Sequence, residues 1–176
     1  MVFNSKMSWL SGSGLGYPFW LGQNPQPLPY GCFLSTQNQT VAGANINTPL
    51  TYNVTDLASQ TYISGSKIYV EASGVYRVLF TVQTDTTSGG SQTVIIFFRK
   101  NGVNIANSAS TFTIANNAEN IAVCEIIVSL LYGDYIEVVM QSSDAGMKAS
   151  YFAAGGVAPN TYPAVPSIIT VIQKIA

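Results

Sequence analysis

The chain has 176 residues and a formal net charge of −1, and only 9% of its residues are charged, against about 25% in an ordinary soluble domain. Its seven Lys and Arg residues are scattered, which argues against nucleic-acid binding, and there is no histidine to shuttle protons or hold a metal. No run of 18 apolar residues is present, so the sequence predicts no transmembrane helix.

Residues 1–31 differ in composition from the rest of the chain. They hold both tryptophans, five glycines and four prolines, and Lys6 is their one charge. Because proline fixes its own φ and biases the residue before it, we expect an extended N-terminal arm without a core of its own. The arm is either a disordered tail or a segment that docks on a neighbouring subunit. In the second case the anchors are Trp9, Tyr17, Phe19, Trp20 and Leu21.

Residues 32–176 alternate short strands with turn-forming clusters, which predicts one all-β domain. The Asn101-Gly102 pair is the strongest hairpin signal. No stretch has a sustained 3.6-residue period, so a helix is expected only as a short turn around Thr55–Ser59. The predicted strands are Cys32–Thr40, Leu50–Asn53, Lys67–Glu71, Gly74–Thr84, Ser91–Lys100, Val103–Asn107, Thr111–Ile114, Asn120–Leu131, Asp134–Ser142, Lys148–Ala153 and Ser167–Ile175.

Side chains alternate between the two faces of a strand, and this alternation predicts the core. In Gly74–Thr84 the inward set is Tyr76, Val78, Phe80 and Val82, and across the sandwich it is Ala122, Cys124, Ile126, Val128 and Leu130. The strand Ser91–Lys100 is apolar on both faces, with Val94, Ile96 and Phe98 on one side and Ile95 and Phe97 on the other. Such a strand is either covered twice or lies at a subunit contact, so we name Ile95 and Phe97 as candidate assembly contacts.

Five segments resemble, in order, the C1q/TNF-like jelly roll, and more narrowly the version found in structural proteins of viruses and phages. They are Asn47–Asp56, Gly65–Phe80, Phe98–Ser108, Leu130–Ser142 and Pro166–Gln173. The most specific markers are the GVYR start of a long strand, the RKNG hairpin, the GDYIE strand and the terminal PSIITV strand. The resemblance implies a single jelly-roll sandwich of two antiparallel four-stranded sheets, with adjacent chain ends and assembly into rings that are mostly trimeric. No collagen-like or coiled-coil stalk is present, which favours a particle component over a secreted C1q protein.

The usual equipment for catalysis is missing from the sequence. Without histidine no Ser-His-Asp or Cys-His arrangement can form, and no phosphate-binding glycine loop occurs. The carboxylates show no spacing that selects a catalytic pair, and Glu125, inside an apolar strand, needs a partner such as Arg77 or Arg99. Cys32 and Cys124 are expected to be buried free thiols, with a bridge between them left open. We therefore expect no enzyme, no cofactor and no metal site.

These observations predict a structural protein of a virus particle: a capsid component that assembles through its sheet faces and its N-terminal arm. Few charges mean little repulsion between copies, which permits dense packing. A small single jelly roll suits a fivefold vertex, so we favour a penton or minor capsid protein, a pentamer that contacts other capsid proteins, over a trimer. No signal peptide is recognisable, so we expect synthesis in the host cytoplasm and residence in the virion. The alternative is a receptor- or glycan-binding trimeric head of a viral fibre, or a C1q-like binding module.

Overall fold

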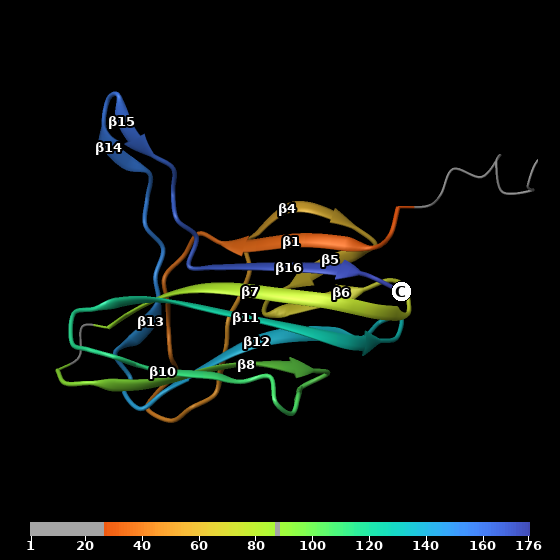
Figure 1. Cartoon of the computed structure of the whole chain (residues 1–176), viewed down its shortest axis with the longest axis horizontal. Helices are drawn as coiled ribbons and strands as arrows, with labels where there is room; N and C mark the ends of the chain where they lie inside the picture. Colours follow the sequence, from red (N-terminus) through yellow and green to blue (C-terminus); the bar gives the residue numbers. More distant parts are fainter. Residues whose placement is uncertain (1–26, 87–88) are drawn as a thin grey trace, which may run out of the picture.

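The computed structural model describes residues 27–86 and 89–176 of the chain, which fold into two antiparallel β-sheets packed face to face (Figure 1). No helix occurs in these residues. Sheet A runs in the order β2 (Gln39–Thr40), β13 (Met147–Ala149), β7 (Gly74–Thr86), β16 (Ile168–Lys174), β1 (Tyr30–Ser35) and β4 (Val54–Ser59), with β11 (Glu119–Leu130) also paired to β7. Sheet B runs in the order β10 (Ser110–Ile114), β8 (Gln92–Lys100), β12 (Tyr135–Ser142), β6 (Lys67–Val70) and β5 (Thr61–Ser64), with β3 (Thr48–Pro49) on β12 and β9 (Val103–Asn104) on β8. A separate hairpin consists of β14 (Gly155–Val157) and β15 (Asn160–Tyr162).

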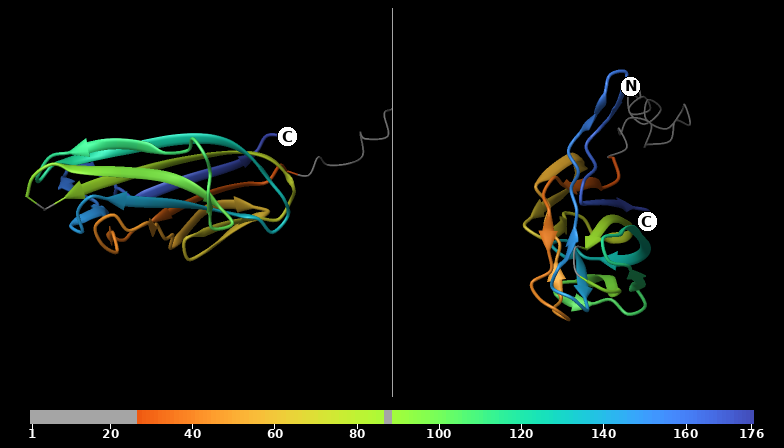
Figure 2. Two further views of the ribbon diagram at one scale, coloured as in Figure 1. Left: turned by 90° about the horizontal axis from the view of Figure 1, so that it is seen from below. Right: turned by 90° about the vertical axis from the view of Figure 1, so that its left-hand side faces the viewer.

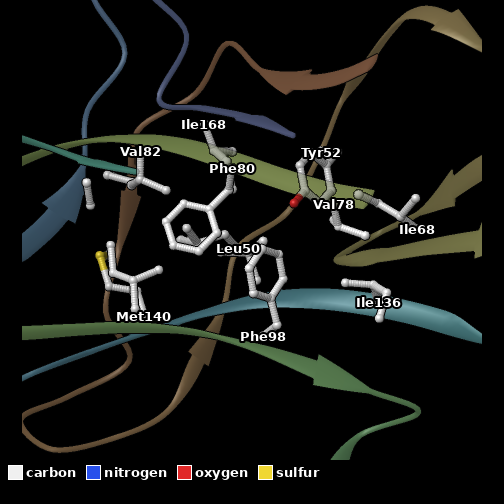
Figure 3. Packing of buried hydrophobic residues seen from close by; sticks show 14 of the residues in the cluster. Leu50, Tyr52, Ile68, Val78, Phe80, Val82, Phe98, Ile136, Met140 and Ile168 are labelled. Atoms are coloured by element: carbon white, nitrogen blue, oxygen red, sulfur yellow. The ribbon is translucent and has the colours of Figure 1, made fainter. Parts of the chain in front are cut away.

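The core lies between the two sheets and follows the predicted alternation. Tyr76, Val78, Phe80 and Val82 of β7 are fully buried, which confirms the inward set of that strand. The Phe80 ring meets the Phe98 ring of β8 at a centroid distance of 5.0 Å, so the two sheets are joined by a pair of aromatic side chains (Figure 3). In β8, where the sequence left the inward side open, Val94, Ile96 and Phe98 are the fully buried set.

The expectation that β11 lies across the sandwich from β7 is wrong, because the two strands pair with each other in sheet A. Strand β11 also contributes less to the core than expected. Ala122 and Leu130 are buried, whereas Cys124, Ile126 and Val128 are only partly buried although they pack against the core. The cause is position: β11 pairs with β7 alone and forms the end of its sheet, so sheet B covers it incompletely.

Three sequence expectations need correction. The segment expected as a helical turn, Thr55–Ser59, lies in strand β4, which pairs with β1. The predicted strand Leu50–Asn53 is absent. Leu50 and Tyr52 are nevertheless buried core residues, so the apolar pattern of this segment indicates burial and not a strand. Each main sheet has seven strands where the resemblance implied four, because short strands extend both sheets at their margins.

The turns and ends are arranged largely as the sequence indicated. Asn101 (φ 51°) and Gly102 (φ 80°) form the predicted hairpin turn between β8 and β9. Tyr30, the first residue of β1, pairs with Gln173 near the C-terminus, so the described chain begins and ends at the same end of the sandwich (Figure 1). The five aromatic and apolar residues named as anchors, which lie between residues 9 and 21, are outside the described residues.

Candidate assembly face on sheet A

The outward side of sheet A is predominantly apolar. Its register places Cys32 of β1 between Leu57 of β4 and Val171 of β16, and Val171 in turn lies beside Leu79 of β7. On the other side of β7, Thr81 pairs with Val123 of β11. We call this surface the A-face; its apolar members are Cys32, Leu34, Leu57, Leu79, Ile121, Val123, Ile127, Ile169 and Val171.

Several of these side chains are exposed to solvent. The exposed fraction runs from 39% for Val171 to 66% for Ile127, with Leu57, Ile121 and Val123 between them. Isolated exposed apolar residues are ordinary on a soluble protein, but a continuous set across neighbouring strands marks a contact surface. The A-face therefore resembles a protein–protein interface in its exposed apolar side chains.

One ion pair crosses the A-face. The Arg77 guanidinium donates two hydrogen bonds to the Glu125 carboxylate, from Nε to Oε1 and from Nη2 to Oε2, each 2.7 Å long. These hydrogen bonds raise the pKa of Arg77 and lower the pKa of Glu125. Arg77 is thus the partner of Glu125, and the pair presents no net charge to a surface that covers it.

Beside this ion pair the A-face is hollowed. A depression of about 110 Å³ is lined by Arg77, Leu79, Val171 and Gln173, from the adjacent strands β7 and β16. Two of the four lining residues are apolar, and the other two can hydrogen bond. The hollow can therefore receive a small apolar side chain while a polar group at its rim remains paired.

Both cysteines are free thiols, as expected, but each is only partly buried, so the expectation of full burial is wrong. Cys32 lies on the A-face, and partial burial, together with the nearby Asp56 carboxylate, raises the pKa of its thiol. Cys124 faces the other side of sheet A and its Sγ lies 3.7 Å from the carbonyl oxygen of Ser108. The two thiols lie on opposite sides of one sheet, so no bridge joins them within the chain.

The candidate contacts Ile95 and Phe97 lie on the outward side of sheet B, away from the A-face. Phe97 is only 8% exposed and its ring is covered by the Arg99 guanidinium, whose Cζ lies 5.6 Å from the ring centroid. Ile95 is partly exposed. Their role in assembly stays a prediction.

The A-face itself was not predicted from the sequence, although the sequence contains a pattern that indicates it. Ile121, Val123 and Ile127 make β11 apolar on both faces.

A row of tyrosines crosses sheet B on the same outward side. Tyr62 and Tyr69 stack with ring centroids 5.0 Å apart, and Tyr69 meets Tyr135 at 5.3 Å. The Lys67 ammonium lies 4.6 Å from the centroid of the Tyr135 ring. These cross-strand contacts stabilise β5, β6 and β12 against one another.

Among residues 27–86 and 89–176, no group of three or more His, Cys, Asp or Glu side chains could hold a metal ion. Within the same residues, no helix has the length and apolar character needed to cross a membrane.

Comparison with known proteins identifies the fold. No family model and no curated protein matches the sequence. Among solved structures, the crystal structure of murine APRIL at pH 5.0 has a TM-score of 0.54 at 11% identity, covering 83% of this chain and 98% of that one. Murine APRIL at pH 8.5 (TM-score 0.49, 14% identity, coverage 84% and 98%) and the globular domain of zebrafish complement 1qA (0.44, 16%, 83% and 94%) are also similar. The fold is a TNF/C1q-like jelly roll, which confirms the C1q/TNF part of the resemblance. The narrower likeness to structural proteins of viruses and phages stays a prediction.

Proposed function

We propose that this protein is a non-enzymatic structural protein whose copies associate through the A-face. The observation that carries the proposal is the continuous exposed apolar surface over β4, β1, β16, β7 and β11, crossed by one self-neutralised ion pair. Covering such a surface removes apolar area from water, which favours association, and the Arg77–Glu125 pair stays neutralised when it is covered. The low charge of the whole chain supports the same conclusion, since copies repel one another little.

The test is a matched pair of substitutions, Val123→Asp on the A-face and Val103→Asp on β9. Both valines are strand residues with more than half of the side chain exposed, 53% and 70%, but Val103 belongs to sheet B. Burying an unpaired carboxylate in a contact costs about 3 kcal/mol, so Val123→Asp should raise the dissociation constant about 100-fold. Sedimentation equilibrium measures this constant, and thermal unfolding of both variants checks that the fold is intact.

Val103→Asp should leave the dissociation constant within about twofold of the unsubstituted protein, because surface changes outside a contact have small effects. A monomeric unsubstituted protein, or equal effects of the two substitutions, would contradict assembly through the A-face.

We further propose that the assembly is part of a virus particle, as a penton or minor capsid protein beside other capsid proteins, made in the host cytoplasm. The support is the resemblance of the segment order to viral jelly rolls and the combination of low charge with an aromatic N-terminal segment. Native mass spectrometry distinguishes the placements. Five copies support the fivefold vertex, whereas three copies, together with a location on projecting fibres, count against it.

A second candidate is a glycan-binding module, favoured by the tyrosine row on sheet B. Tyr62 is 46% exposed at the end of the row, and Lys67 lies within it. Aromatic faces with a few polar groups beside them are common features of small-molecule sites. A glycan array tests this candidate: binding that Tyr62→Ser abolishes and Val123→Asp leaves unchanged would support it, and absence of binding would remove it.

A further inference from the structure

The β14–β15 hairpin stands away from the body of the molecule. It lies between β13 and β16 in the chain and forms a two-stranded sheet of its own. Figures 1 and 2 show it rising past the strand β4, which ends sheet A, with its tip far from either main sheet. Nothing in the core of the sandwich requires a segment of this kind.

The hairpin is internally ordered. Gly155 pairs with Tyr162 and Val157 with Asn160, and a Cβ at Gly155 would lie 2.5 Å from the Tyr162 hydroxyl oxygen, so the tyrosine ring covers the glycine. Below the hairpin, Phe152 and Val165 exchange two backbone hydrogen bonds of 3.0 and 2.8 Å. This segment is therefore held in a defined shape before it meets any partner, and order of this kind lowers the entropic cost of binding.

Its surface is uncharged and presents two large apolar side chains beside the polar Asn160 and Thr161. Val157 near the tip is 82% exposed and Tyr162 is 55% exposed. No charged residue occurs between Lys148 and Lys174, which is a long gap even in this chain. A two-stranded hairpin alone in water is marginally stable, so an ordered and exposed apolar hairpin is accounted for most simply by a surface that it packs against.

The A-face is the surface that matches it. Both strands that flank the excursion, β13 and β16, belong to sheet A, and β16 carries Val171 of the A-face, so the hairpin is continuous in the chain with the proposed interface. It extends past β4, the outermost strand on that side, and so points toward the space that a neighbour beside this edge would occupy (Figure 1). The Arg77–Glu125 pair on the A-face neutralises itself, and the hairpin carries no charged residue.

We propose that the β14–β15 hairpin of one copy packs on the A-face of a second copy and fastens the assembly. This inference rests on the proposed association through the A-face and adds a specific segment to it. The hollow beside Val171 is a concave part of the A-face, and Val157 is the exposed large apolar side chain nearest the hairpin turn. Contact between the tip and the hollow would bury apolar surface on both copies.

The first experiment compares Val157→Asp with Val103→Asp. Both valines lie in exposed hairpins, at 82% and 70% exposure, so the substitutions are chemically matched. Val157→Asp should raise the dissociation constant of the assembly by about tenfold or more, whereas Val103→Asp should not change it.

The second experiment locates the contact. A photo-reactive benzophenone residue replaces Val157, and isotopically labelled and unlabelled copies are mixed before irradiation. Mass spectrometry of the assembled protein should show crosslinks between copies that end within residues 119–130 or 168–174. Crosslinks confined to one copy, or ending outside sheet A, would overturn the inference.

The outcomes separate the two proposals. If Val123→Asp weakens assembly while Val157→Asp does not and no crosslink joins two copies, the hairpin inference fails and the A-face proposal stands. If the unsubstituted protein is a monomer, both fail.

Discussion

At the scale of single residues, Asp134 connects two neighbouring turns. Its Oδ1 accepts a hydrogen bond from Asn101 Nδ2 at 2.7 Å, and its Oδ2 accepts one from the Leu131 amide and pairs with Lys100 Nζ, both at 2.8 Å. Partial burial alone would raise the pKa of this carboxyl. The hydrogen bonds from Lys100, Leu131 and Asn101 outweigh burial and lower the pKa of Asp134 to about 2. The folded state therefore stabilises the ionised carboxylate of Asp134 more than the unfolded chain does.

A pH dependence of stability follows from this lowered pKa. The contribution of Asp134 is fully present above its ordinary pKa of 3.8 and is lost as the pH falls through about 2. Asp134→Asn should therefore lower the free energy of unfolding by about 2 kcal/mol at pH 7 and by much less at pH 2. Urea unfolding at several pH values measures the difference, and Asp56→Asn, at an exposed position on β4, is the control. A penalty that is the same at pH 7 and pH 2 would show that charge does not cause the effect.

At the scale of elements, strands that are apolar on both faces had two different outcomes. In β8 the second face is largely covered within the subunit, because Arg99 lies over Phe97 and β12 supplies the buried Val139 beside it. In β11 the second face stays open, because β11 ends its sheet and no element within residues 27–86 and 89–176 covers Ile121, Val123 and Ile127. The same sequence pattern therefore marks a closed surface in a strand with neighbours on both sides and an open one in a terminal strand.

At the scale of the whole molecule, the two ends of the sandwich have different roles in the proposed assembly. The chain enters sheet A at Tyr30 beside the C-terminus, and the C-terminal ends of β7 and β12 lie at the other end of the sandwich (Figure 1). The N-terminal segment is thus attached at one end of the A-face. This arrangement is consistent with a segment that reaches a neighbouring subunit, which stays a prediction for residues 1–26.

Deletion of residues 1–26 tests the arm. The deletion stops short of Pro29, whose carbonyl accepts the Lys174 amide at 2.8 Å, so it spares β1 and its contact with β16. We expect the sandwich to fold with unchanged thermal stability while assembly is lost, since the aromatic anchors are removed and the core is intact. Circular dichroism and native mass spectrometry measure the two properties. Normal assembly of the shortened chain would show that the arm is a tail.

The sequence by itself determined the fold class, the inward set of β7 and the Asn101-Gly102 turn, whereas the structure selected the inward set of β8. These depend on local rules: side chains alternate along a strand, and a tight turn needs residues that tolerate positive φ. From the sequence, the candidate partners of Glu125 were Arg77 and Arg99. The structure selects Arg77, because β7 and β11 are paired strands and bring the two side chains together.

The tertiary structure alone decided which apolar surfaces stay open. The A-face is assembled from five strands that are far apart in the chain, and whether each apolar side chain is covered depends on its neighbour in the sheet. The β14–β15 hairpin is a second example. Its sequence contains turn-forming residues, but only the structure shows that the hairpin projects away from the two sheets. Exposure is a property of packing between distant segments, and local residue patterns do not contain it.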